Sequence, residues 1–158
     1  MERKIKVVVA DDMEIIVRNM KSVIEENPNV EKIESVFNGE DEINAILNLK
    51  PDIVFTDMQM PKKTGLEVIE EVMRNTSIEK KPQFILVTAD RDSSLVIKSR
   101  ELGFYIEYKP INASRINEYI NNFADSEKDD EEKQKEFETR RKEPKREIFL
   151  IKFFKSLR

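Results

Sequence analysis

At its centre the chain reads Asp52-Ile53-Val54-Phe55-Thr56-Asp57, an almost unbroken apolar and β-branched run that ends in an acid. A short run of this kind is typical of a parallel strand that is covered on both faces of its sheet. Further β-branched runs occur at 5–10, 32–37, 84–88 and 104–108. Helix-like amphipathic segments alternate with them, at about 13–27, 40–49, 65–75, 92–102 and 112–123. The strict alternation predicts an α/β fold, a doubly wound sheet of five parallel strands with five helices.

Apolar spacing also indicates which face of each helix is buried. In the segment at 40–49, Ile43, Ile46 and Leu47 fall on one stripe. This stripe is therefore expected to cover the sheet.

The composition excludes several classes of active site. The 158 residues include neither Cys nor His, which rules out disulfides, thiolate nucleophiles, Cys- or His-based metal centres and a Ser–His triad. A bound metal would need oxygen ligands, which favours Mg²⁺, Ca²⁺ or Mn²⁺. The net charge of −4 does not suggest nonspecific binding to nucleic acid. The N-terminus is unlike a signal peptide and no apolar stretch approaches the roughly 18 residues of a membrane span, so a cytoplasmic protein is expected.

The character of the chain changes after Phe123. Of the 23 residues at 125–147, 18 are charged, which predicts a charged linker that is too polar to build a core and behaves as an extended tether. The final segment at 148–158 interleaves apolar residues with Lys and Arg and is expected to be a short amphipathic tail. Two interpretations stay open: a disordered or loosely helical extension whose apolar end contacts its own domain or a partner, and a segment that docks on a partner or makes weak contact with a membrane surface. We therefore predict one domain at 1–124, followed by this linker and tail.

Polar residues follow four of the five predicted strands. Asp11-Asp12 ends the first, Asp57 the third and Thr88 the fourth, while the fifth runs into Lys109-Pro110. Because the carboxyl ends of parallel strands meet at one edge of a sheet, these groups should share a crevice. Three neighbouring carboxylates repel one another unless a cation lies between them, and Mg²⁺ is the natural choice. A carboxylate beside Mg²⁺, a lysine and a hydroxyl has what phosphoryl transfer needs.

Taken singly, each of these residues has a plainer structural explanation. Asp11 or Asp12 could cap the first helix, Asp57 could begin a turn, and Lys109-Pro110 could form another turn with a solvated lysine. Their joint placement at strand ends favours a functional site over coincidence.

In these motifs the sequence resembles the receiver domain of two-component response regulators, a family with a flavodoxin-like fold. The resemblance covers roughly residues 4–124. It rests on Asp11-Asp12, on Asp57-Met58-Gln59-Met60-Pro61 followed by Gly65-Leu66-Glu67, on Thr88-Ala89 and on Lys109-Pro110.

The resemblance implies a role for each site residue. Asp57 would be the phosphoacceptor. Mg²⁺ would be bound directly by Asp12, Asp57 and the backbone carbonyl of Gln59, with Asp11 acting largely through water. Thr88 and Lys109 would hold phosphoryl oxygens, and the peptide bond before Pro110 would be cis.

One position departs from the family pattern. Receivers usually carry an aromatic residue or His three residues before the lysine, where a ring moves inward when the Thr hydroxyl engages phosphate. Here that position is Ile106, so either Tyr105 or Tyr108 takes the role through a shifted bulge, or the usual ring movement is absent.

The expected function is that of a receiver that takes a phosphoryl group on Asp57 from a phosphohistidine donor and signals by docking to proteins. Its partners would be a sensor histidine kinase or phosphotransfer protein and a downstream protein, and its own chemistry would be limited to self-phosphorylation and self-dephosphorylation. Two alternatives stay open. A truncated or atypical DNA-binding regulator would use the basic stretch at 140–158, and an Mg²⁺-dependent phosphohydrolase of similar fold would need a second acid where Gln59 stands.

Overall fold

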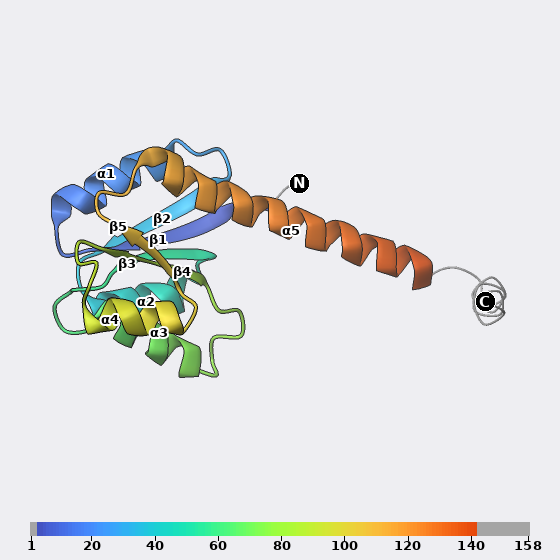
Figure 1. The fold of residues 1–158 in the computed structure, drawn as a ribbon. Coiled ribbons are helices and arrows are strands. Elements are labelled where there is room, and N and C mark those ends of the chain that lie inside the picture. Colours follow the sequence, from blue (N-terminus) through green and yellow to red (C-terminus); the bar gives the residue numbers. More distant parts are fainter. Residues whose placement is uncertain (1–2, 142–158) are drawn as a thin grey trace. The chain divides into compact units, whose positions relative to one another are not determined.

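The computed structural model describes residues 3–141 and shows five strands alternating with five helices (Figure 1). The strands are β1 (Ile5–Ala10), β2 (Val30–Val36), β3 (Ile53–Asp57), β4 (Gln83–Thr88) and β5 (Tyr105–Tyr108). The helices are α1 (Glu14–Glu25), α2 (Gly39–Leu49), α3 (Gly65–Arg74), α4 (Ser94–Glu101) and α5 (Ala113–Arg141). The α/β prediction is confirmed, with strand boundaries within two residues of those expected.

All pairings in the sheet are parallel, in the strand order β2-β1-β3-β4-β5. Figure 1 shows α2, α3 and α4 on one face of the sheet, with α1 and the beginning of α5 on the other. The order reverses between β1 and β3, so the crevice at the carboxyl edge opens between these two strands. The fold therefore brings the ends of β1 and β3 together at the place where such sheets bind ligands.

Polar side chains start three of the helices. Asn38 caps α2 by accepting a hydrogen bond from the backbone N–H of Asp41, and Ser93 caps α4 in the same way. Thr64 and Glu67 form a reciprocal capping box at the start of α3. These caps explain why the loops that follow β2, β3 and β4 end where they do.

The central strands supply most of the core. Every residue of β3 is buried, and Val7, Val8 and Val9 of β1 are fully covered. The helix faces were less well predicted. The buried residues of α2 are Gly39, Glu42, Ala45, Ile46 and Leu49, whereas Leu47, expected on the buried stripe, is 38% exposed.

The fifth helix is longer than its apolar pattern predicts. It continues past Phe123 to Arg141, so the part of the predicted linker at 125–141 is helical, as the helical alternative allowed, and not an extended tether. Its residues are mainly Glu, Lys, Gln and Arg, which have high intrinsic helix propensity, and burial is not needed to favour the helix locally. The predicted tail at 148–158 lies outside the described residues.

The chain divides into two structural units, residues 1–122 and residues 123–158. This division lies close to the expected end of the domain at 124, and the roles assigned to the linker and tail remain predictions. Among the helices of the described part of the chain, none has the length and apolar character to cross a membrane.

Candidate functional site

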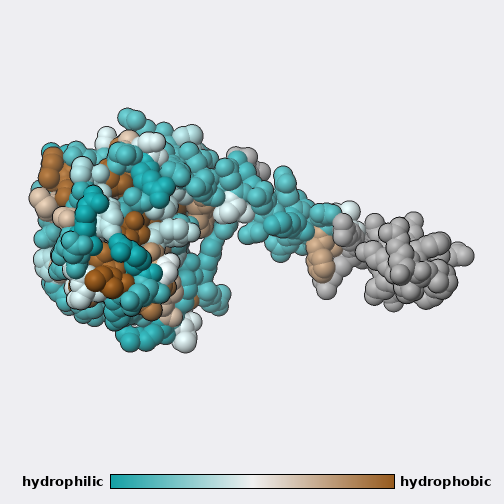
Figure 2. All heavy atoms as spheres, viewed as in Figure 1, coloured by the Kyte–Doolittle hydropathy of each residue, from teal (hydrophilic) through white to brown (hydrophobic). Residues whose placement is uncertain are grey.

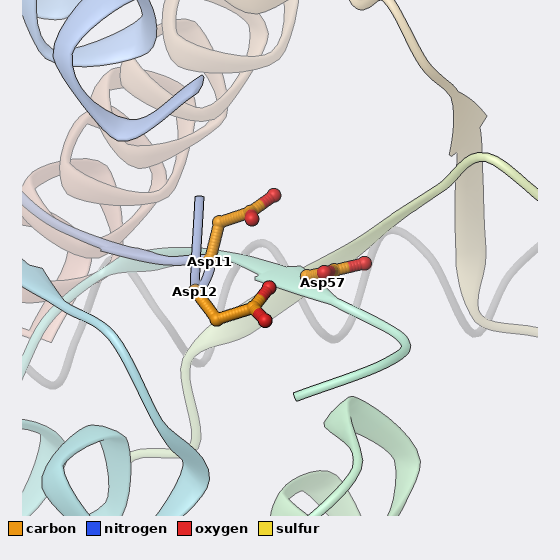
Figure 3. A group of neighbouring side chains, drawn as sticks. All are labelled: Asp11, Asp12 and Asp57. Atoms are coloured by element: carbon orange, nitrogen blue, oxygen red, sulfur yellow. The ribbon is translucent and has the colours of Figure 1, made fainter. Parts of the chain in front are cut away.

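Three carboxylates meet at the carboxyl edge of the sheet, where β1 and β3 end (Figure 3). Oxygen atoms of Asp11, Asp12 and Asp57 all lie within 4.8 Å of one another. Asp11 and Asp57 are buried, while Asp12 is exposed. The side chains that the sequence placed at two strand ends therefore form one cluster, in which Asp12 is the member exposed to solvent.

The backbone around Asp57 is held closely in place. The N–H of Met58 donates to the carbonyl of Val87 at 3.3 Å, and the N–H of Gly65 donates to the carbonyl of Met58 at 3.1 Å. A Cβ atom on Gly65 would lie 2.4 Å from the carbonyl oxygen of Asp57, so only glycine allows α3 to begin this close to the strand. The backbone from which the Asp57 side chain projects is therefore held in place.

Lys109 completes the cluster from the end of β5. Its Nζ lies 2.6 Å from Oδ2 of Asp11 and 3.2 Å from Oδ2 of Asp57. Its N–H donates to the carbonyl of Thr88 at 2.8 Å, and the peptide bond between Lys109 and Pro110 is cis. The ammonium group thus bridges two of the three carboxylates.

For Asp57 and Lys109 alike, burial and the opposite charge of the partner shift the pKa in opposite directions. Burial raises the pKa of Asp57, and the neighbouring charge of Asp11 adds to that rise, while Lys109 and the N–H of Gln59 partly oppose it. Burial alone would lower the pKa of Lys109, but the hydrogen bond to Asp11 and the charge of Asp57 outweigh it and raise that pKa. The cluster therefore keeps Lys109 charged and makes additional positive charge favourable beside Asp57.

The donor set suits a hard divalent cation. Three carboxylates within reach of one ion match the oxygen ligands that Mg²⁺ prefers, and neither His nor Cys occurs anywhere in the sequence. The N–H of Gln59 donates to Oδ1 of Asp57 at 3.4 Å, which places the Gln59 backbone beside the cluster. The residues present therefore fit Mg²⁺.

Thr88 lies at the end of β4, one residue beyond the partner of Asp57 in the sheet register. Its side chain is buried, and its hydroxyl accepts a hydrogen bond from the N–H of Asp90 at 3.2 Å. The hydroxyl is thus engaged with the loop that leads to α4.

The two candidate switch tyrosines lie on opposite faces of β5. Tyr105 is 53% exposed, and its ring packs edge-on against Tyr119 at 5.7 Å between centroids. Tyr108 lies opposite Thr88 in the register and packs against the core together with Ile106. The guanidinium group of Arg91 lies over its ring, 4.4 Å from the ring centre. Of the two tyrosines, Tyr108 is the one that shares the face of Ile106.

Sequence reasoning missed Glu42, a fully buried acid one turn into α2. Its Oε2 accepts a hydrogen bond from the hydroxyl of Thr56, the residue before Asp57, at 3.0 Å. The available signal was spacing, since Glu42, Ala45, Ile46 and Leu49 follow the helical repeat. Its charge concealed its place on the buried face.

Comparison with known families matches residues 7–121 to the response regulator receiver domain. The chain belongs to this family. It is therefore a receiver domain of the two-component type, as its strand-end motifs indicated.

Curated relatives carry similar receivers within longer proteins. The chain is 36% identical over 102 residues to protein-glutamate methylesterase/protein-glutamine glutaminase 3 of Geobacter sulfurreducens, covering 64% of this chain and 26% of that protein. It is 30% identical over 112 residues to the transcriptional regulatory protein BtsR of Escherichia coli, covering 71% of this chain and 45% of that protein. The chain thus spans less than half the length of either relative.

Solved structures of receivers have the same fold. The N-terminal domain of an uncharacterized protein from Wolinella succinogenes aligns with a TM-score of 0.69 at 25% identity, covering 78% of this chain and 96% of that chain. The response regulator domain of Thermotoga maritima CheB aligns with a TM-score of 0.65 at 23% identity, covering 78% and 98%. The second likeness concerns the fold alone.

Proposed function

We propose that this receiver accepts a phosphoryl group on Asp57 from a phosphohistidine donor, with Mg²⁺ bound at the acidic cluster, and passes the signal on by docking to a protein. The observation that carries the proposal is the meeting of Asp57 with two further carboxylates and the Lys109 ammonium at the sheet's carboxyl edge. This arrangement provides an oxygen nucleophile, oxygen ligands for a cation and a fixed positive charge at one point.

The reaction transfers one group between two nucleophiles. A carboxylate oxygen of Asp57 forms a bond to phosphorus while the bond from phosphorus to the donor's imidazole nitrogen breaks, and the bonding electron pair stays on that nitrogen. The product is an acyl phosphate on Asp57. The hydrogen bonds of Met58 to Val87 and Gly65, and the close approach of Gly65 to the Asp57 carbonyl, hold the backbone from which this carboxylate reacts.

Mg²⁺, when bound by Asp11, Asp12, Asp57 and the Gln59 carbonyl, would supply positive charge to the phosphoryl oxygens. Lys109 contributes the chain's own cation, because its Nζ lies close enough to Asp57 to donate to a phosphoryl oxygen attached there. The Thr88 hydroxyl would exchange its contact with Asp90 for another phosphoryl oxygen, which connects the site to the loop before α4.

The surface beside the cluster suits a protein donor. Met13 and Ile15 directly follow the acid pair and are 52% and 54% exposed. Figure 2 shows apolar side chains gathered over the start of α1 and over α4, each group surrounded by hydrophilic residues. A histidine kinase or phosphotransfer protein that presents its phosphohistidine to Asp57 would cover the first of these patches.

Intact mass after incubation with Mg²⁺ and acetyl phosphate tests the proposal. Wild type should gain one phosphoryl group, Asp57→Asn none, and Asp92→Asn, which removes an exposed acid from the next loop, as much as wild type. A phosphoryl group on folded Asp57→Asn protein would overturn the assignment. Sustained hydrolysis of an ordinary phosphomonoester, which is too poor a donor to phosphorylate a receiver, would instead favour a phosphohydrolase.

A further inference from the structure

Glu42 is an acid in an apolar setting, behind the strand that carries Asp57. Its side chain is 0% exposed and lies on the face of α2 that packs on the core. Oε2 accepts the Thr56 hydroxyl at 3.0 Å, while Oε1 has no hydrogen-bond partner among the described residues. An ionised carboxylate with one hydrogen bond is unfavourable in such a place, because burial removes its hydration.

Burial raises the pKa of Glu42 to about 8, the hydrogen bond from Thr56 lowers it in part, and the charge of Asp57 raises it further. The side chain therefore holds a proton at neutral pH. Two observations of geometry support this state independently: the absence of exposure and the unpartnered Oε1.

The Thr56 hydroxyl faces two acceptors and has only one hydrogen to donate. Its Oγ1 lies 3.0 Å from Oε2 of Glu42 and 3.4 Å from the carbonyl oxygen of Asp57. If Glu42 is protonated, it can donate to Oγ1, which leaves the Thr56 hydrogen for the Asp57 carbonyl. If Glu42 is ionised, the carboxylate takes that hydrogen, and the Asp57 carbonyl loses it.

Other charged groups near α2 are engaged elsewhere or lie on the Asp57 side. In the loop before α3, Lys62 pairs with Glu40 at 3.3 Å and Lys63 with Glu71 at 2.7 Å. The end of β1 carries Asp11 and Asp12, and β3 carries Asp57, whose charge acts directly on Glu42. The nearest influence on Glu42 is therefore negative, and it favours the protonated side chain.

We propose that Glu42 is a positioning residue for Asp57, which holds a proton, sets the Thr56 hydroxyl toward the Asp57 backbone, and opposes phosphorylation of Asp57 when that proton is lost. This inference rests on the proposed function of Asp57. Proton binding at Glu42 and negative charge at Asp57 are linked, so each favours the other by the same factor. The receiver would thus become a poorer phosphoacceptor in alkaline solution because of a residue that never contacts phosphate.

The linkage can be measured without any phosphorylation. Carbon-detected NMR on the full chain, labelled at Glu side-chain carboxyls, should show Glu42 titrating near pH 8 in wild type. Asp57→Asn should lower that midpoint by about half a pH unit or more, which corresponds to about a threefold coupling. Thr56→Val should raise it, because the carboxylate loses its hydrogen bond. A midpoint near 4.5, or one that does not move in Asp57→Asn, would overturn the proposal.

The consequence for phosphorylation needs a second readout. With saturating Mg²⁺ and acetyl phosphate, the rate for wild type relative to Glu42→Gln should fall between pH 7 and pH 9, by at most the roughly threefold coupling of the titration, because the phosphoryl group brings further negative charge to Asp57. Glu40→Gln, which removes an exposed acid from the same helix, should keep the wild-type profile. Parallel pH profiles for wild type and Glu42→Gln would refute the role, and so would loss of the wild-type fall in Glu40→Gln to the same extent as in Glu42→Gln. If Glu42→Gln does not fold, the Asp57→Asn titration decides alone. Phosphorylation of Asp57→Asn would remove the proposed function while leaving the titration result valid.

Discussion

Glu42 should make the stability of this receiver fall as the pH rises. The group has an ordinary pKa of 4.5 in the unfolded chain and about 8 in the folded one, so between these values the native state binds the extra proton. Stability from this group is therefore fully present below pH 4.5 and is lost as the pH rises toward 8. The slope is about −1.4 kcal/mol per pH unit, so the loss over the whole window is about 5 kcal/mol.

Glu42→Gln removes the titration but keeps the size and shape of the side chain. Gln can still accept from Thr56, while its buried amide N–H groups lack partners, at a cost of about 1–3 kcal/mol. The variant should be less stable than wild type at pH 5 and should gain on it by about 4 kcal/mol by pH 8, so the order reverses.

Urea unfolding followed by circular dichroism at pH 5, 6, 7 and 8 measures this difference directly. The comparison between the two proteins cancels the pH dependence of the titratable groups that do not interact with Glu42. A constant difference in the free energy of unfolding across this range would refute the assignment of a buried, protonated Glu42. Glu40→Gln serves as the control. Because the Glu40 side chain is exposed, the difference in the free energy of unfolding between this variant and wild type should not change with pH.

Four further outcomes follow from the structure. Mg²⁺ should stabilise the wild type by about 2.7 kcal/mol at a hundredfold excess over Kd, and Asp12→Ala should lose most of this stabilisation. Equal melting temperatures of the wild type with and without Mg²⁺ would contradict the metal site. Lys109→Met should raise the pKa of Asp57 further and slow its phosphorylation about tenfold or more; an unchanged rate would exclude the cation's role. Gly65→Ala should lower the free energy of unfolding by about 2 kcal/mol, and no change in urea would show that the close approach to Asp57 is not tight. A 1–124 truncation should still fold and take phosphate, and its failure to fold would show that the predicted domain boundary is wrong.

The sheet edge was accessible to sequence reasoning because parallel strands place their carboxyl ends together. Asp11, Asp57 and Lys109 each follow an apolar run, so knowledge of strand direction alone was enough to gather them. No long-range distance had to be known. The identity of the nucleophile came from the resemblance in its flanking motif.

The rotation of a helix about its own axis is decided by tertiary packing. The apolar residues Ile43, Ile46 and Leu47 predict a stripe that the structure turns toward Glu42 and Leu49, and this rotation exposes Leu47 and buries an acid. Packing of α2 against β1, β2 and α3 sets this angle, and the hydrogen bond to Thr56 makes the buried acid tolerable. A Glu in the sequence does not reveal that its side chain will be buried and protonated in the core.

The sequence by itself determined the succession of strands and helices along the chain and the edge that carries the acids, because these depend on local periodicity and on strand direction. The family followed from the resemblance of the strand-end motifs. The tertiary structure alone decided that Lys109 bridges Asp11 and Asp57, and that Glu42 lies unexposed behind the strand. These last features depend on side chains far apart in the chain, whose distance and dielectric surroundings exist only after the helices have packed on the sheet.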